Sequence, residues 1–117
     1  MIKKGSNRWV FIFNKLVFKI PSLHSWKNFL WGLLANIQEK EFSRIHDMNE
    51  KLCPIIFSLP LGILVVMPRV RVLNEGELSI EILEKFCRIN NNYIIPSELK
   101  YDSFGYFKGK LVAIDYG

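Results

Sequence analysis

The fold is decided by the longest helical pattern in the chain, residues 22–52, which reads SLHSWKNFLWGLLANIQEKEFSRIHDMNEKL. Apolar residues recur in it at steps of three and four, as on one face of a helix. They are Trp26, Leu30, Leu33, Leu34, Ile37, Ile45, Met48 and Leu52. Ser22 or Ser25 can cap its start, because a serine hydroxyl accepts a hydrogen bond from a free amide of the first turn. We expect one long helix that packs on a sheet.

Short β-rich runs flank this helix on both sides. Before it, RWVFIF and LVFKI are separated by Asn14-Lys15, and Asn tolerates the left-handed backbone of a two-residue hairpin loop. Residues 8–20 therefore form a predicted hairpin that Pro21 ends. After the helix, IIFS and GILVVM are predicted strands, and PRVRVLNEGE is a predicted polar connection.

The last third of the chain predicts a second helix, LSIEILEKFCRINN, and a hairpin that turns at Lys108-Gly109 and ends in KLVAIDYG. Strands gathered around one long helix are typical of an α+β fold. The sequence thus predicts an antiparallel sheet with one long packed helix, a second helix and a C-terminal hairpin, in one domain over residues 1–117.

Composition indicates which kinds of partner and which cellular location suit this chain. The chain has 117 residues, 50% of them hydrophobic, and a net charge of +5, which suits an acidic partner, a nucleic acid or simply a lysine-rich surface. Cys53 and Cys87 have apolar neighbours and no metal-ligand spacing, so we expect reduced residues in a cytoplasmic protein. The most apolar run, residues 52–68, is shorter than the ~20 residues of a membrane helix, and Pro54 and Pro60 interrupt it.

The order of these elements, with the residues at their joints, resembles the amino-terminal half of the protein-kinase fold. Lys19 in LVFKI matches the lysine of the third kinase strand, and Glu39, twenty residues later, matches the helix glutamate that pairs with it; Glu41 is the second choice. The resemblance makes residues 8–67 a small-lobe-like part and residues 68–117 the hinge, second helix and catalytic-loop-like hairpin.

Two further stretches carry the resemblance. SELKYDSFG is similar to the catalytic loop, with Glu98 in the place of the aspartate and Ser103, five residues later, in that of the asparagine. Asp115-Tyr116-Gly117 is similar to the Asp-Phe-Gly motif. The nearest likeness is to small phage-encoded kinase-like proteins that end in IDYG.

The resemblance implies a role for each position. Lys19 paired with Glu39 would grip the α and β phosphates of ATP, Asp115 and Ser103 would hold Mg²⁺, and Glu98 would be the catalytic base beside Asp115. The residues alone leave plainer alternatives open: a solvent-facing strand lysine for Lys19, a solvated helix face for Glu39, and a terminal turn for Asp115. For Glu98, an ordinary polar loop is the favoured alternative.

Four departures from the kinase pattern argue against catalysis. Gly5 is the only glycine before Gly32, so a glycine-rich phosphate loop is absent. The base would be a glutamate, one methylene longer than aspartate, and small errors of position are costly in phosphoryl transfer. Ser103 is a poorer metal ligand than asparagine, although Asp102 could partly substitute for it. The sequence also stops at Gly117, without a substrate-binding lobe.

Without that lobe, the apolar residues of the second half need another cover, which predicts a homodimer or a protein partner. Candidates for this surface are Tyr93, Phe104, Tyr106 and Phe107, with Ile94 and Ile95.

The first functional hypothesis is a non-catalytic kinase-like protein that binds a protein, as a phage inhibitor or modulator of a host protein in the host cytoplasm. The first alternative is a minimal ATP-dependent phosphotransferase. The second is a nucleic-acid binder, suggested by basic residues interleaved with Trp9 and Phe11.

Overall fold

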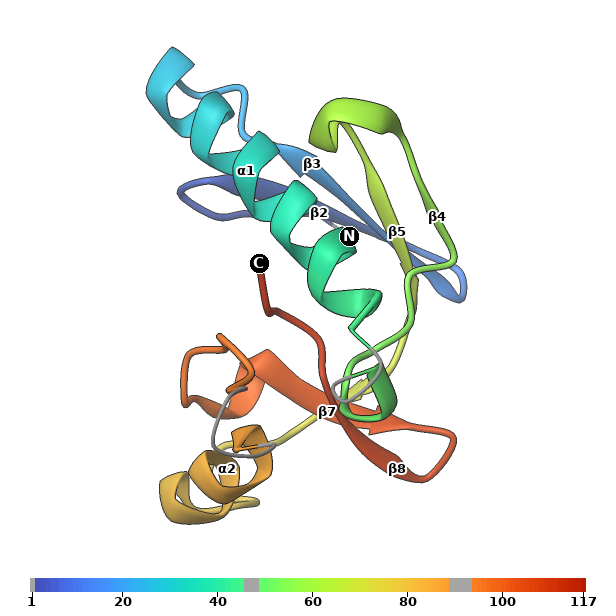
Figure 1. The fold of residues 1–117 in the computed structure, drawn as a ribbon, viewed down its shortest axis with the longest axis vertical. Coiled ribbons are helices and arrows are strands. Elements are labelled where there is room, and N and C mark those ends of the chain that lie inside the picture. Colours follow the sequence, from blue (N-terminus) through green and yellow to red (C-terminus); the bar gives the residue numbers. More distant parts are fainter. Residues whose placement is uncertain (1, 46–48, 89–93) are drawn as a thin grey trace. The chain divides into compact units, whose positions relative to one another are not determined.

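The computed structural model describes residues 2–45, 49–88 and 94–117, and their backbone divides into two units (Figure 1). Unit 1 comprises residues 1–41, 54–69 and 117, and unit 2 comprises residues 42–53 and 70–116. The fold is α+β, as the sequence predicts.

Unit 1 is built on a five-stranded antiparallel sheet in the order β1-β2-β3-β5-β4. The strands are β1 (Ile2–Lys4), β2 (Arg8–Phe13), β3 (Leu16–Pro21), β4 (Phe57–Ser58) and β5 (Val65–Pro68). The predicted hairpin is confirmed: Phe13 pairs with Leu16, and Asn14 in the loop has a left-handed φ of 55°. The sequence did not predict β1, whose three residues are all exposed.

Helix α1 (Trp26–Ser43) lies across one face of this sheet (Figure 1). The Ser25 hydroxyl accepts a hydrogen bond from the Asn28 amide, which identifies the cap among the two candidates. The helix is shorter than predicted. Leu52 is not helical, because in unit 2 it forms a parallel bridge with Ala113 and the Cys53 amide donates to the Ala113 carbonyl at 2.8 Å. Met48 lies outside the described residues.

The face of α1 that packs inward is the opposite of the one that its hydropathy predicts. The buried residues of the helix are Gly32, Asn36 and Glu39. Four apolar residues of the predicted packing face, Trp26, Leu30, Leu34 and Ile37, are exposed, with Trp26 at 73% and Leu30 at 48%, and Leu33 is half-buried. Hydropathy predicts the wrong face because the inward side of the helix packs closely against backbone and carries charged and polar side chains, and does not pack against an apolar core.

Two glycines allow the close approach of α1 to its neighbours in unit 1. A Cβ at Gly32 would lie 2.2 Å from the Asn7 carbonyl oxygen and 2.7 Å from the Pro21 Cα. A Cβ at Gly62, whose φ is +75°, would lie 2.2 Å from the carbonyl oxygen of Leu33. Only glycine permits backbone to approach the helix this closely.

Unit 2 holds a three-stranded antiparallel sheet in the order β6-β7-β8 and a second helix. These elements are β6 (Arg71–Val72), β7 (Phe104–Phe107), β8 (Lys110–Ala113) and α2 (Ile80–Cys87). The hairpin turn at Lys108 and Gly109 is confirmed, with φ of 53° and 77°, as a two-residue loop requires. Strand β6 lies in the stretch predicted to be a polar connection.

Single 3₁₀ turns occur in both units, at Pro60–Gly62 in unit 1 and at Asn49–Lys51 and Tyr101–Ser103 in unit 2.

The core of unit 2 forms around aromatic residues. Phe104 is fully buried, with its ring edge-on to Phe86 at a centroid distance of 6.0 Å. Tyr116 is also fully buried, and its hydroxyl donates to the Cys53 carbonyl at 2.9 Å. The middle residue of Asp115-Tyr116-Gly117 therefore belongs to the unit 2 core.

No helix within the described parts of the chain is long and apolar enough to span a membrane.

Candidate functional site

The pair that the kinase resemblance suggested is formed in unit 1. Lys19 lies in β3 and Glu39 in the C-terminal third of α1, and the Lys19 Nζ donates to both carboxylate oxygens of Glu39, at 2.9 and 3.1 Å. The Glu39 side chain is fully buried, and that of Lys19 is 7% exposed. The solvated alternatives for these two residues are therefore wrong, since both turn inward.

A second cation joins this pair, which the sequence did not predict. Arg8 of β2 contacts the other side of the Glu39 carboxylate, with Nη1 2.7 Å from Oε1 and Nη2 3.2 Å from Oε2. Such a two-pronged arginine contact adds both strength and a defined geometry. Glu39 is thus held by two cations, and the three side chains carry a net charge of +1.

Asn36 ties these side chains to the backbone. Its Oδ1 accepts from the Arg8 guanidinium at 3.2 Å, and its Nδ2 donates to the carbonyls of Lys19 at 3.1 Å and Gly62 at 2.9 Å. Asn36 is fully buried, so these bonds replace water on its amide. We call Arg8, Lys19, Asn36 and Glu39 the ion cluster.

Strand register explains why these residues meet. Arg8 pairs with Pro21, and Lys19 pairs with Val10, so Arg8 and Lys19 lie on the same face of the β2–β3 hairpin. On α1, Asn36 and Glu39 are three residues apart and share one face. The hairpin register and the helix spacing can both be inferred from the sequence. Considered together, they would have predicted that Arg8 and Asn36 lie beside Lys19 and Glu39.

The electrostatics of the cluster favour the ionised carboxylate. Burial acts to raise the pKa of Glu39, but the Lys19 and Arg8 charges and their hydrogen bonds outweigh burial and hold this pKa below its ordinary value of 4.5. Within the described residues, no buried side-chain nitrogen or oxygen lacks a hydrogen-bond partner. The cluster can therefore hold a permanent charge in the interior of unit 1.

The positions assigned to catalysis and metal binding lie in unit 2. Glu98 is exposed, and its carboxylate pairs with Lys100 at 3.0 Å. Ser103 is buried, with 1% of its surface exposed, while Asp102 and Asp115 are exposed. The Asp115 carbonyl accepts a hydrogen bond from the Ser97 hydroxyl. The searched parts of the chain contain no group of three or more His, Cys, Asp or Glu residues placed to hold a metal ion.

The predicted partner surface in unit 2 divides into core residues, half-buried residues and the exposed Ile94, which is 65% exposed. Phe104 and Ile95 are core residues, with exposures of 0% and 2%, so neither offers surface to a partner. Tyr106 and Phe107 are half-buried, and Tyr93 lies outside the described residues. Partner binding by Tyr106 and Phe107 stays a prediction.

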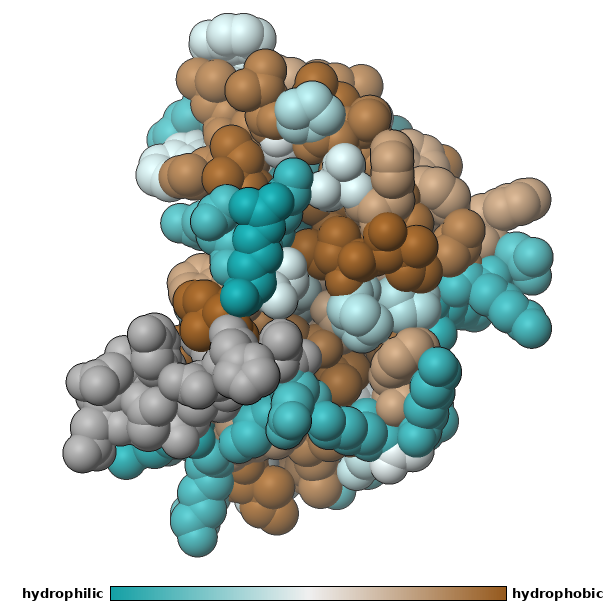
Figure 2. All heavy atoms as spheres, turned by 45° about the vertical axis from the view of Figure 1, so that its right-hand side comes forward, coloured by the Kyte–Doolittle hydropathy of each residue, from teal (hydrophilic) through white to brown (hydrophobic). Residues whose placement is uncertain are grey.

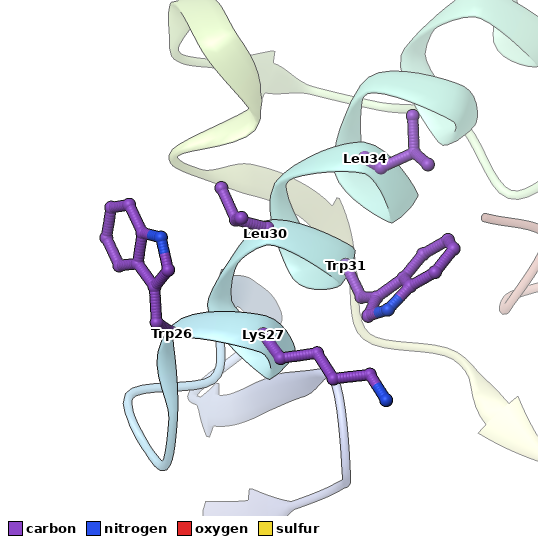
Figure 3. A pocket seen from close by; sticks show the side chains of 5 residues that line it. All are labelled: Trp26, Lys27, Leu30, Trp31 and Leu34. Carbon is purple, nitrogen blue, oxygen red and sulfur yellow. The ribbon is translucent and has the colours of Figure 1, made fainter.

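A second candidate surface is the outer side of α1. Trp26, Leu30, Trp31, Leu34 and Ile37 are all exposed and follow one another over three turns of the helix. Figure 3 shows the first four with Lys27, whose side chain extends on the same side of the helix as Trp31. We call Trp26, Lys27, Leu30, Trp31, Leu34 and Ile37 the α1 stripe.

Apolar exposure in unit 1 continues beyond the α1 stripe. The segment that contains β4 and the 3₁₀ turn Pro60–Gly62 exposes Ile56, Phe57, Leu59, Leu61 and Ile63. Figure 2 looks onto this side, where hydrophobic side chains gather over unit 1. Contiguous exposed apolar surface of this kind marks interaction sites in folded proteins.

Comparisons of this chain with protein-family models, curated proteins and solved structures find no match.

Proposed function

We propose that the chain is a kinase-like domain that binds protein and does not transfer phosphate. The observation that carries this proposal is the α1 stripe, because the longest helix exposes Trp26, Trp31, Leu30 and Leu34 while it buries glycine, asparagine and glutamate. An apolar helix face of this size is stabilised when a partner covers it.

Three features of the candidate site support the absence of phosphoryl transfer. Ser103 is buried, with 1% of its surface exposed, so little of it is open to a hydrated Mg²⁺. Glu98, the expected base, is already paired with Lys100. The turn between β1 and β2, residues 5–7, contains one glycine and thus lacks the run of backbone amides that cradles phosphates.

The proposal is tested by a phosphotransfer assay with labelled ATP and Mg²⁺, on the protein itself and on a generic protein acceptor. We expect no transfer above that of the Asp115→Asn variant. This variant suits the comparison because Asp115 is exposed and its substitution leaves the core intact. Transfer by the wild type that Asp115→Asn abolishes would show that the protein is an enzyme.

The alternative, an ATP-dependent phosphotransferase, is favoured by one observation, the Lys19–Glu39 pair. By the kinase resemblance, the lysine of this pair would grip the α and β phosphates of ATP. If ATP is a ligand, ATP at a hundred times its Kd stabilises the fold by about 2.7 kcal/mol, which is several degrees in Tm. No thermal shift at millimolar ATP and Mg²⁺ would count against this alternative.

The ion cluster argues against the nucleic-acid alternative. Arg8 and Lys19, two of the basic residues that suggested it, bind Glu39 inside unit 1. No observation on the remaining basic residues favours nucleic acid over an ordinary basic surface.

A further inference from the structure

We propose that the α1 stripe pairs with the α1 stripe of a second copy of this chain, antiparallel, about a two-fold axis at Leu34. The inference rests on the proposed protein-binding function and names its partner. Three observations carry it: the spacing of the exposed residues, the charges at the two ends of the helix, and the size of the stripe.

The exposed residues of α1 follow the spacing of a helix–helix seam. Residues 27, 30, 31, 34, 37, 38 and 41 are all exposed, at steps of three and four. The residues between them are buried or half-buried. A repeat near 3.5 residues keeps one line of side chains facing a partner helix over several turns. The stripe is therefore suited to another helix more than to an extended peptide.

The charges at the ends of this seam select an antiparallel copy. Lys27 lies seven residues before Leu34, and Glu41 lies seven residues after it. A two-fold axis at Leu34 places Lys27 of each copy against Glu41 of the other, so the seam has one such ion pair at each end. Between each ion pair and the axis, Trp31 of one copy lies against Ile37 of the other. A parallel pair would instead place like charges together at both ends.

The same pairing adds a favourable charge at the start of α1. The first turn has no acidic residue and carries Lys27, whereas the last turn holds both Lys40 and Glu41. Lys27 opposes the helix dipole, which favours acidic groups at the N-terminus of a helix. Antiparallel pairing brings Glu41 of the second copy to each N-terminus.

The size of the stripe predicts a weak dimer. Trp26 and Trp31 are 73% and 51% exposed, and Leu30, Leu34 and Ile37 are 38–48% exposed. Together they offer on the order of 450 Å² per copy, since an aromatic side chain buries about 150–250 Å² when fully covered. A total of about 900 Å² lies below the ~1,200 Å² of the smallest standard interfaces, which suits a micromolar dissociation constant.

Charge reversal tests the proposal on the full chain by sedimentation equilibrium at low salt. Lys27→Glu alone and Glu41→Lys alone each place like charges at both ends, and we expect each to raise the dissociation constant about tenfold. The double variant restores both attractions. An equimolar mixture of the two single variants also restores them, because each chain then meets its complement. Lys110→Glu on β8 is the control for Lys27→Glu, with the same change in net charge at an exposed site.

Dimerisation of the wild type, the double variant and the mixture, with weakening in both single variants alone, supports the proposal. A monomeric wild type at several hundred micromolar overturns it, and binding to anionic vesicles would then assign the stripe to a lipid surface. Dimers that all variants form equally also overturn it, because the interface is then elsewhere. None of these outcomes depends on phosphotransfer, so the dimer and the non-catalytic function can fail separately.

Discussion

Glu39 lies between two cations in the interior of unit 1, where water does not screen their charges. Lys19 and Arg8 reach it from adjacent strands, and Asn36 accepts a hydrogen bond from the Arg8 guanidinium and donates one to the Lys19 backbone carbonyl. Burying such charges is costly, so the cluster does not have to add net stability compared with an apolar core. Removing one member, however, leaves the others buried without compensation.

We therefore expect Glu39→Gln to lower the free energy of unfolding by about 3 kcal/mol, because two buried cations lose their counter-charge. Urea denaturation followed by circular dichroism measures this change. Glu75→Gln is the matched control, an exposed glutamate that we expect to change stability by less than about 0.5 kcal/mol. Equal effects of the two substitutions would show that the ion cluster is not structurally important.

The lowered pKa of Glu39 predicts an acid-sensitive contribution to stability. A carboxyl whose pKa is lower in the folded than in the unfolded state stabilises the fold fully above its ordinary pKa of 4.5, and loses that contribution as pH falls further. The stability difference between wild type and Glu39→Gln should thus be constant near neutral pH and shrink below about pH 4. A difference that grows on acidification would contradict the lowered pKa.

At the scale of single residues, two of the four members of the ion cluster could be predicted from the sequence. Lys19 and Glu39 were found through their kinase-like spacing of twenty residues. Arg8 and Asn36 were not, because an arginine at the start of a strand and an asparagine within a helix are ordinary residues until the hairpin register and the helix face are considered together. Glu98, Ser103 and Asp115 keep their catalytic roles only as predictions of the resemblance.

At the scale of elements, α1 shows what hydropathy can and cannot predict. The period of three and four residues correctly indicated a helix, but the apolar side was assumed to be the packed one. The packed side instead carries Gly32, whose missing side chain admits the Asn7 and Pro21 backbone. Close backbone approach leaves no hydropathy signal. β1 and β6 were missed because they are edge strands of three and two residues, exposed throughout.

The packing of α1 predicts whether a substitution at Gly32 stabilises or destabilises the protein. Helix propensity alone predicts that Gly32→Ala stabilises the protein by about 1 kcal/mol. We expect it instead to destabilise by about 1–3 kcal/mol, because the added methyl would lie 2.2 Å from the Asn7 carbonyl oxygen and force α1 away from β3. Thermal unfolding decides between the two signs, and a higher Tm would mean that the helix does not approach the strand so closely.

At the scale of the whole molecule, the proposed dimer links folding to protein concentration. A species that associates only when folded is stabilised by mass action, so its Tm rises with concentration. For a micromolar dimer, an increase from about 10 to about 1,000 μM stabilises each chain by about 1 kcal/mol. That is a rise of several degrees in Tm for a chain of this length.

We expect this rise for the wild type and a smaller one for Lys27→Glu, because repulsion between its substituted side chain and Glu41 of the second copy shifts dimerisation to about tenfold higher concentration. Differential scanning calorimetry over the concentration series measures both. The Lys110→Glu control should follow the wild type, because its site lies outside the α1 stripe. A Tm independent of concentration in all three proteins would mean that the exposed tryptophans of α1 do not mediate self-association. The apolar side of the helix would then need a partner other than a second copy.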